Sequence, residues 1–280
     1  MKRLLLGLLG LALVVGIAAV ALAPTVGNQY RLWRDAKAVS EYRQAAEALD
    51  MLATGTRLAQ AWRVNEGLRE AALADAFDEA YAWGEDDEAE VLDLTGSGVI
   101  AVLEIPKLGV TLPVVRGFSH NALARGVVHL EGTSLPVGGD GAFCVLAGQG
   151  GGRFAGLLDG LDRLMAGDCF YLQALQDTLV YEVEQVQTLS PSDLAPVPVD
   201  GDADICALMT ATGEGERLLV RAGRVGRRQA LPEDDTQLLP GWAARLIFAA
   251  PLALAGLIAL ALIEALRRAA SRRRVKRMKL

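Results

Sequence analysis

The chain of 280 residues has only two histidines, His120 and His129, and three cysteines. The histidines are not closely spaced to each other or to a pair of cysteines, so no zinc-type metal site is predicted. The glycine-rich stretch LAGQGGGRF at residues 146–154 lacks the lysine and serine or threonine of a phosphate-binding loop. We therefore expect neither a metal, nor a nucleotide, nor any other cofactor.

Long apolar runs occur near both ends of the chain. Residues 4–23 are about 20 uncharged residues, enough to cross a bilayer as a helix, and Lys2 and Arg3 precede them. A second run covers residues 246–266, and eight arginines and lysines follow it. Basic flanks stay on the cytoplasmic side, so both termini are expected inside the cell. The small residues at 21–23 also fit a cleaved signal peptide, but Pro24 disfavours cleavage.

These features predict the organisation of the chain in the cell membrane. We expect a cytoplasmic N-terminus at 1–3, a transmembrane helix or uncleaved signal anchor at 4–23, a second transmembrane helix at 246–266 and a basic cytoplasmic tail at 267–280. Between the spans we expect a helical region at 24–98, a β domain at 99–230 and a linker at 231–245. All three cysteines then lie outside the cell, where disulfides are allowed.

The charge of the predicted outer part argues against a nucleic-acid partner. Ten of the 28 basic residues flank the spans, which leaves 18, against 33 acidic residues once Glu264 in the second span is set aside. A net charge near −15 repels DNA and RNA. The partner expected from the apolar runs and their basic flanks is the lipid bilayer.

The outer part changes texture along its length. From residue 36 to 81 apolar residues recur at helical spacing, with a break predicted at the TGT of residues 54–56, and the acidic residues 84–90 predict a solvated linker. Beyond these, short apolar runs between turn residues predict the strands of an all-β sandwich or barrel. These runs are residues 99–105, 110–115, 142–147, 169–172, 179–189, 203–209 and 217–225.

The segment from 104 to 148 is the most specific part of the sequence. It contains Ile105-Pro106-Lys107 and, at 128–139, VHLEGTSLPVGG. These motifs resemble the sortase family, in particular the pilus-assembling class C sortases, and the likeness continues through 157–172 and 217–225. It implies an eight-stranded β-barrel with an N-terminal helical or lid region and two membrane spans. It also implies a transpeptidase fold that acts on LPXTG-like sorting signals at the cell wall.

The resemblance also implies a catalytic cysteine, histidine and arginine. In register with the family, Gln149 falls at the histidine, Ala211 at the cysteine and Arg217 at the arginine, and the loop between Ala211 and Arg217 is about three residues shorter than usual in the family. Glutamine exchanges no proton near neutral pH and a methyl group cannot attack a carbonyl. We therefore predict a pseudoenzyme that binds a sorting signal or pilin, or scaffolds active sortases. An active transpeptidase with an unrecognised nucleophile and a decayed paralogue are the alternatives.

The cysteines and a lid motif complete the candidate site. Cys144 and Cys206 each lie five residues before a replaced position, so their side chains should face the other side of the strands. If those strands are parallel neighbours, as the family implies, the two cysteines are close, either as buried thiols or as a disulfide. Asp75 and Phe77 resemble the class C lid triplet, whose aspartate meets the arginine, although an ordinary acidic helix would also explain them. His129 is expected to be structural.

Overall fold

The computed structural model describes residues 29–68, 70–71, 75, 77, 87–117, 120–123, 126–150, 157–195, 197–198 and 202–229. The predicted membrane spans and the basic tail lie outside these residues. No helix among the described residues is long and apolar enough to span a bilayer. Residues 34–235 form one compact unit, and the fold below is that of this unit.

Two helices precede the β domain. Residues 29–47 are helical, and α2 follows at Met51–Gly67. The helical region is interrupted at residues 48–50 and not at the TGT of residues 54–56, where the break was predicted. Asp50 caps α2 because its carboxylate accepts the Ala53 N–H at 2.7 Å. The helix then runs through the TGT, where the Thr56 hydroxyl donates to the Leu52 carbonyl one turn earlier.

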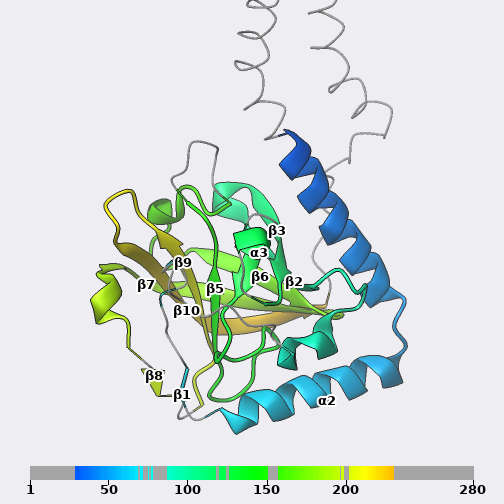
Figure 1. Cartoon of the computed structure of the whole chain (residues 1–280). Coiled ribbons are helices and arrows are strands. Elements are labelled where there is room, and N and C mark those ends of the chain that lie inside the picture. Colours follow the sequence, from blue (N-terminus) through cyan, green and yellow to red (C-terminus); the bar gives the residue numbers. More distant parts are fainter. Residues whose placement is uncertain are drawn as a thin grey trace, which may run out of the picture. The chain divides into compact units, whose positions relative to one another are not determined.

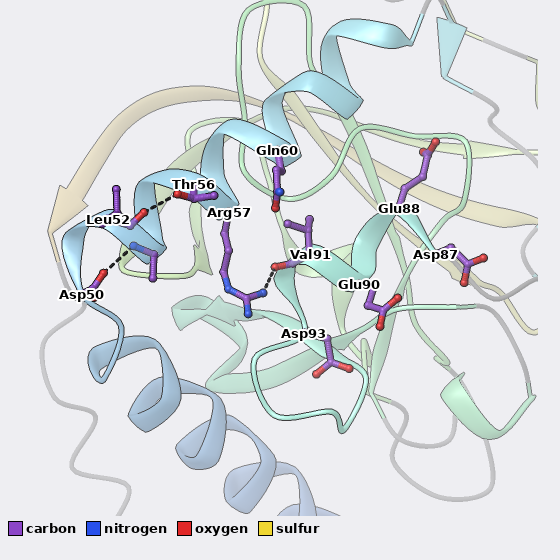
Figure 2. Close-up of a pocket in the computed structure, with 11 residues that line it drawn as sticks. Asp50, Leu52, Thr56, Arg57, Gln60, Asp87, Glu88, Glu90, Val91 and Asp93 are labelled. Carbon is purple, nitrogen blue, oxygen red and sulfur yellow. Dashed lines mark hydrogen bonds between the residues drawn. The ribbon is translucent and has the colours of Figure 1, made fainter.

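The prediction of a solvated linker at 84–90 is wrong for residues 88–90, the part of it that belongs to a helix in the structure. A 3-10 helix, η1, covers Glu88–Leu92, and it buries Ala89 and Leu92 in the barrel core while its acidic side chains face solvent. Arg57 of α2 donates to the Val91 carbonyl at 2.6 Å. This contact lies beside a pocket of about 800 Å³ lined by residues of α2 and η1. Figure 2 shows the lining side chains, several of which are carboxylates. Because Ala89 and Leu92 are interspersed with the acidic residues, this segment packs on the barrel core.

Eight strands close into a barrel, which confirms the predicted fold (Figure 1). Their order around the barrel is β10-β7-β6-β2-β3-β4-β5-β9. Two-residue strands β1, Glu70–Ala71, and β8, Val197–Pro198, pair separately. Short helices connect some strands: η2 at Pro106–Leu108, α3 at His120–Leu123, η3 at Leu161–Arg163 and η4 at Pro191–Asp193. The barrel strands are β2 (Val99–Ile105), β3 (Val110–Val115), β4 (Val127–His129), β5 (Phe143–Ala147), β6 (Cys169–Ala174), β7 (Asp177–Leu189), β9 (Ile205–Ala211) and β10 (Arg217–Gln229).

Two buried side chains fasten the helices to the barrel. The Tyr42 hydroxyl donates to the Ile100 carbonyl at 2.7 Å and accepts the Leu175 N–H at 3.0 Å. Burial raises the pKa of Tyr42, so the hydroxyl stays a donor. On α2, Asn65 accepts the Leu135 N–H at 2.7 Å, and its amide donates to the carbonyls of Leu135 and Gly138. The helical region is therefore bonded to the barrel backbone as well as packed on it.

Candidate functional site

The two replaced positions lie at the same end of neighbouring strands. β5 and β9 run parallel, and the Gly148 N–H continues the ladder by donating to the Met209 carbonyl at 3.0 Å. Ala147 and Met209 belong to the smaller of the two main apolar clusters of the barrel. Because side chains alternate along a strand, Gln149 and Ala211 continue this same face. Gln149 is exposed and Ala211 half-buried.

Arg217 joins these two positions from the next strand. It opens β10 directly opposite Ala211 in an antiparallel pair, and Leu219, two residues on, belongs to the same apolar cluster. Residues opposite each other in such a pair have side chains on one face of the sheet. The structure therefore brings together the three positions that the sequence register assigned to a catalytic site.

Arg217 is held by Asp75. The Arg217 Nε donates to Asp75 Oδ1 at 2.6 Å and Nη2 donates to Oδ2 at 2.7 Å, while Nη1 donates to the carbonyls of Gly215 and Glu216. The Phe77 ring lies 5.3 Å from the guanidinium carbon. Burial alone would raise the pKa of Asp75, but hydrogen bonds from Arg217 and the Phe77 N–H, with the Arg217 charge, hold it below its ordinary value. The contact expected between Asp75 and Arg217 is thus present.

The Asp75–Arg217 pair predicts a pH-dependent stability. Because the pKa of Asp75 is lower in the folded protein, the pair contributes in full above the ordinary aspartate pKa, and its contribution is lost as pH falls through the depressed value. Asp75→Asn should lower the free energy of unfolding by about 1–2 kcal/mol at pH 7, and the difference should shrink as pH falls below the ordinary aspartate pKa and through the depressed one. Urea unfolding across this pH range measures it. Asp162→Asn, at an exposed carboxylate, is the control. A difference independent of pH would contradict the prediction.

Cys144 and Cys206 lie directly opposite each other in the parallel ladder, inside the larger apolar cluster. They are on the face of the sheet opposite to Gln149 and Ala211, as their spacing predicted. Both are free thiols in the structure. Burial raises the pKa of the Cys206 thiol, and its neighbour Cys144 raises it further. A buried, protonated thiol on the wrong face is unsuited to attack a peptide at Ala211.

Two hydroxyls near Ala211 have no hydrogen-bond partner. They are Thr210 Oγ1 and Thr212 Oγ1. Thr210 is buried and continues the face of Cys206 and Leu208, away from the Gln149 face. A threonine nucleophile needs a neighbouring base, and none is bonded to either hydroxyl. Among the described residues, neither threonine therefore has the base that an activated nucleophile needs.

The glycine-rich loop packs closely on Thr210. A Cβ on Gly150 would lie 2.5 Å from Thr210 Oγ1, which is closer than Cβ atoms lie to non-bonded neighbours in real structures. The Leu158 N–H donates to the Gln149 carbonyl at 3.1 Å and holds the other side of the loop. Glycine at 150 thus permits the backbone at this position to lie against Thr210 near the end of β9.

We expect Gly150→Ala to destabilise the protein by about 1–3 kcal/mol, since the added methyl group pushes the loop off Thr210. Gly213→Ala is the matched control, because a Cβ there meets nothing within 4 Å. Adding Thr210→Ala to Gly150→Ala should recover part of the loss. Chemical denaturation measures the free energy of unfolding of the wild type, the two single variants and the double variant. Equal losses for Gly150→Ala and Gly213→Ala would contradict the packing argument.

The motif at 128–139 is structural here. His129 is 1% exposed, and its Nε2 lies 3.0 Å from the Ser134 carbonyl and 3.2 Å from Thr133 Oγ1. The Thr133 and Ser134 side chains accept the backbone N–H groups of Val145 and Phe143 on β5. The motif thereby fixes β5, and with it the position of Gln149. Among the described residues, no group of histidine, cysteine or acidic side chains is placed to hold a metal ion.

A closed eight-stranded barrel with a buried arginine beside the ends of its parallel β5 and β9 defines the class of protein. A family model described as Sortase domain matches residues 103–225. Solved sortase C structures that are 28–33% identical match 64–72% of this chain, and the chain belongs to the sortase family. None of the curated protein sequences matches it.

Three sortase C structures illustrate the likeness. Sortase C of Streptococcus pneumoniae is 31% identical, with 70% of this chain and 100% of that chain covered and a TM-score of 0.64. The pilus-related sortase C of Group B Streptococcus is 33% identical over 67% of this chain and 96% of that chain, with a TM-score of 0.60. Sortase C1 of Streptococcus agalactiae is 30% identical over 71% and 97%, with a TM-score of 0.59.

Sequence reasoning missed the small contacts that complete the site. The β1–β8 pair joins residues just before Asp75 to the β7–β9 connection, but two residues form no pattern. The close approach of Gly150 to Thr210 also lacks a local signal. The carbonyls of Gly215 and Glu216 that hold Arg217 belong to the loop whose shortness the register had revealed.

Proposed function

We propose that this protein is a sortase C-like surface protein that binds a sorting-signal peptide or pilin subunit without cutting it, beside active sortases. The observation that carries the proposal is the placement of Gln149 just beyond β5 and of Ala211 at the end of the neighbouring β9, opposite a buried Arg217. Among the described residues, the site retains a cation for recognition and has neither a cysteine nor a histidine at the two family positions.

The similar proteins support the kind of ligand. The Streptococcus pneumoniae structure is described in terms of catalysis and pilin substrate specificity, and the Group B Streptococcus enzyme as pilus-related. A pilin or its sorting signal is therefore the natural ligand class for the same barrel here. We further propose that residues 4–23 and 246–266 anchor the chain in the membrane, with the barrel outside, because apolar length and basic flanks favour this topology.

The lid assignment is part of this proposal. Asp75 and Phe77 cover Arg217 in the closed state, and a peptide gains access when they leave. The Phe77 side chain packs against the smaller apolar cluster, the face that Gln149 and Ala211 continue. The same aspartate and phenylalanine therefore shield the site from solvent.

The test uses the full-length protein in detergent with a fluorescent LPXTG-type peptide. We expect binding, seen as fluorescence anisotropy, and no cleavage. Arg217→Ala should abolish binding. Arg221→Ala is the matched control, since Arg221 lies on the same strand and pairs with Glu184 at the surface. Cleavage of the peptide that Cys206→Ala stops would overturn the proposal in favour of an active transpeptidase.

A further inference from the structure

The Arg217 guanidinium has one pair of N–H donors, on Nε and Nη2, that a ligand can bind in place of Asp75. Its Nη1 is used by two backbone carbonyls of its own loop, Gly215 and Glu216. Its Nε and Nη2 face Asp75 in a two-pronged contact at 2.6 and 2.7 Å. When Asp75 leaves, this Nε/Nη2 edge is released while the other contacts remain.

The shape and charge of that edge select a carboxylate. Two parallel N–H donors of a guanidinium match the two oxygens of a carboxylate, whereas a peptide carbonyl offers a single neutral oxygen. Asp75 demonstrates the fit, because it occupies the edge in this geometry. An uncut peptide can therefore satisfy only half of the edge that Asp75 fills.

Burial makes the charge of the ligand matter. The Arg217 side chain is 9% exposed and that of Asp75 is 15% exposed. A ligand that covers Arg217 again after Asp75 and Phe77 have left buries the cation, and a buried cation without an anion is strongly destabilised. A ligand that replaces Asp75 therefore binds more tightly when it brings a negative charge of its own.

The neighbouring residues favour the end of a chain as the source of that charge. Ala211 lies directly opposite Arg217 in the β9–β10 ladder, and its methyl group cannot form an acyl intermediate. A peptide held there keeps whichever end group it arrives with. From these contacts we infer that the site selects peptides ending in a free α-carboxylate over the same sequence continued or amidated. This inference rests on the proposed function and names the ligand of the same site.

The experiment measures anisotropy of fluorescein-labelled peptides with the full-length protein in detergent. The probes are Leu-Pro-Ala-Thr with a free carboxylate, the same peptide as its amide, the continued peptide Leu-Pro-Ala-Thr-Gly amide, and Leu-Pro-Ala-Asp amide. Asp75→Asn removes the competing anion. We expect this variant to bind the free acid at least about tenfold more tightly than either Thr peptide amide. The wild type should bind the acid more weakly than the variant does.

Arg217→Lys tests the two-pronged contact while keeping the positive charge. In the Asp75→Asn background it should reduce the preference for the acid several-fold, with folding checked by thermal unfolding. Equal binding of acid and amide would overturn this inference and leave the proposed function standing. Equal binding of the acid and the Leu-Pro-Ala-Asp amide would overturn the chain-end assignment in favour of a side-chain carboxylate. Failure of every peptide to bind either chain would overturn the proposed function itself.

Discussion

The double variant Gln149→His/Ala211→Cys is expected to cleave an LPXTG-type peptide, with a rate at least about 100-fold above that of the wild type. The physical reason is that the strands around positions 149 and 211, and the arginine at 217, are still in place. Position 149 lies two residues beyond the end of β5, position 211 is the last residue of the neighbouring β9, and Arg217 lies opposite position 211. A thiol and an imidazole placed there share one face of the sheet with the arginine. Release of a fluorophore from the peptide measures the gain.

Single variants separate the two roles. Ala211→Cys alone should react with a thiol reagent and cleave slowly, and Gln149→His alone should be inactive because it supplies no nucleophile. Adding Asp75→Ala to the double variant should raise the rate further, since it frees the Nε/Nη2 edge of Arg217. A folded double variant with no activity, with or without Asp75, would show that the frame is not competent for catalysis.

Asn65→Asp is expected to cost about 3 kcal/mol of unfolding free energy, the larger of the stability effects. The change keeps the size of the side chain but removes both amide donors. It leaves the carbonyls of Leu135 and Gly138 unpaired and turns a buried carboxylate towards them. Urea denaturation at neutral pH, followed by circular dichroism, measures the loss.

The neighbouring Glu66 provides the control. It is exposed on α2, so Glu66→Gln should change the unfolding free energy by less than about 0.5 kcal/mol. An Asn65→Asp protein as stable as Glu66→Gln would mean that the α2 contact does not support the 135–139 loop. In that case the orientation of α2 on the barrel would rest on apolar packing alone.

The barrel was predictable where strands are long and regular. β2 and β3 begin and end at the residues that the apolar runs indicated. β4 was missed because three residues give no detectable alternation. The predicted position of the helix break was wrong because TGT is a weaker signal than a capping aspartate. Asp50 begins α2 by accepting the N–H of Ala53, three residues later. Closure into a barrel came from the resemblance, because alternation alone allowed a sandwich as well.

The site was predictable as a set of positions and not as a set of contacts. Register along the chain located Gln149, Ala211 and Arg217, and parity along the strands located both buried cysteines. Parity cannot report which donors of Arg217 are already used or that Gly150 touches Thr210. Such contacts depend on loops of irregular conformation, in which sequence spacing does not fix distance.

β2 begins before the residues that the family model matches. The sortase match begins at residue 103, inside a strand that starts at Val99 and lies between β3 and β6. A fragment cut at 103 would lose half of β2, including Ile100, whose carbonyl accepts the Tyr42 hydroxyl. It would also shorten the ladders to β3 and β6. A fragment that keeps β2 whole must therefore begin at or before Val99, outside the matched residues.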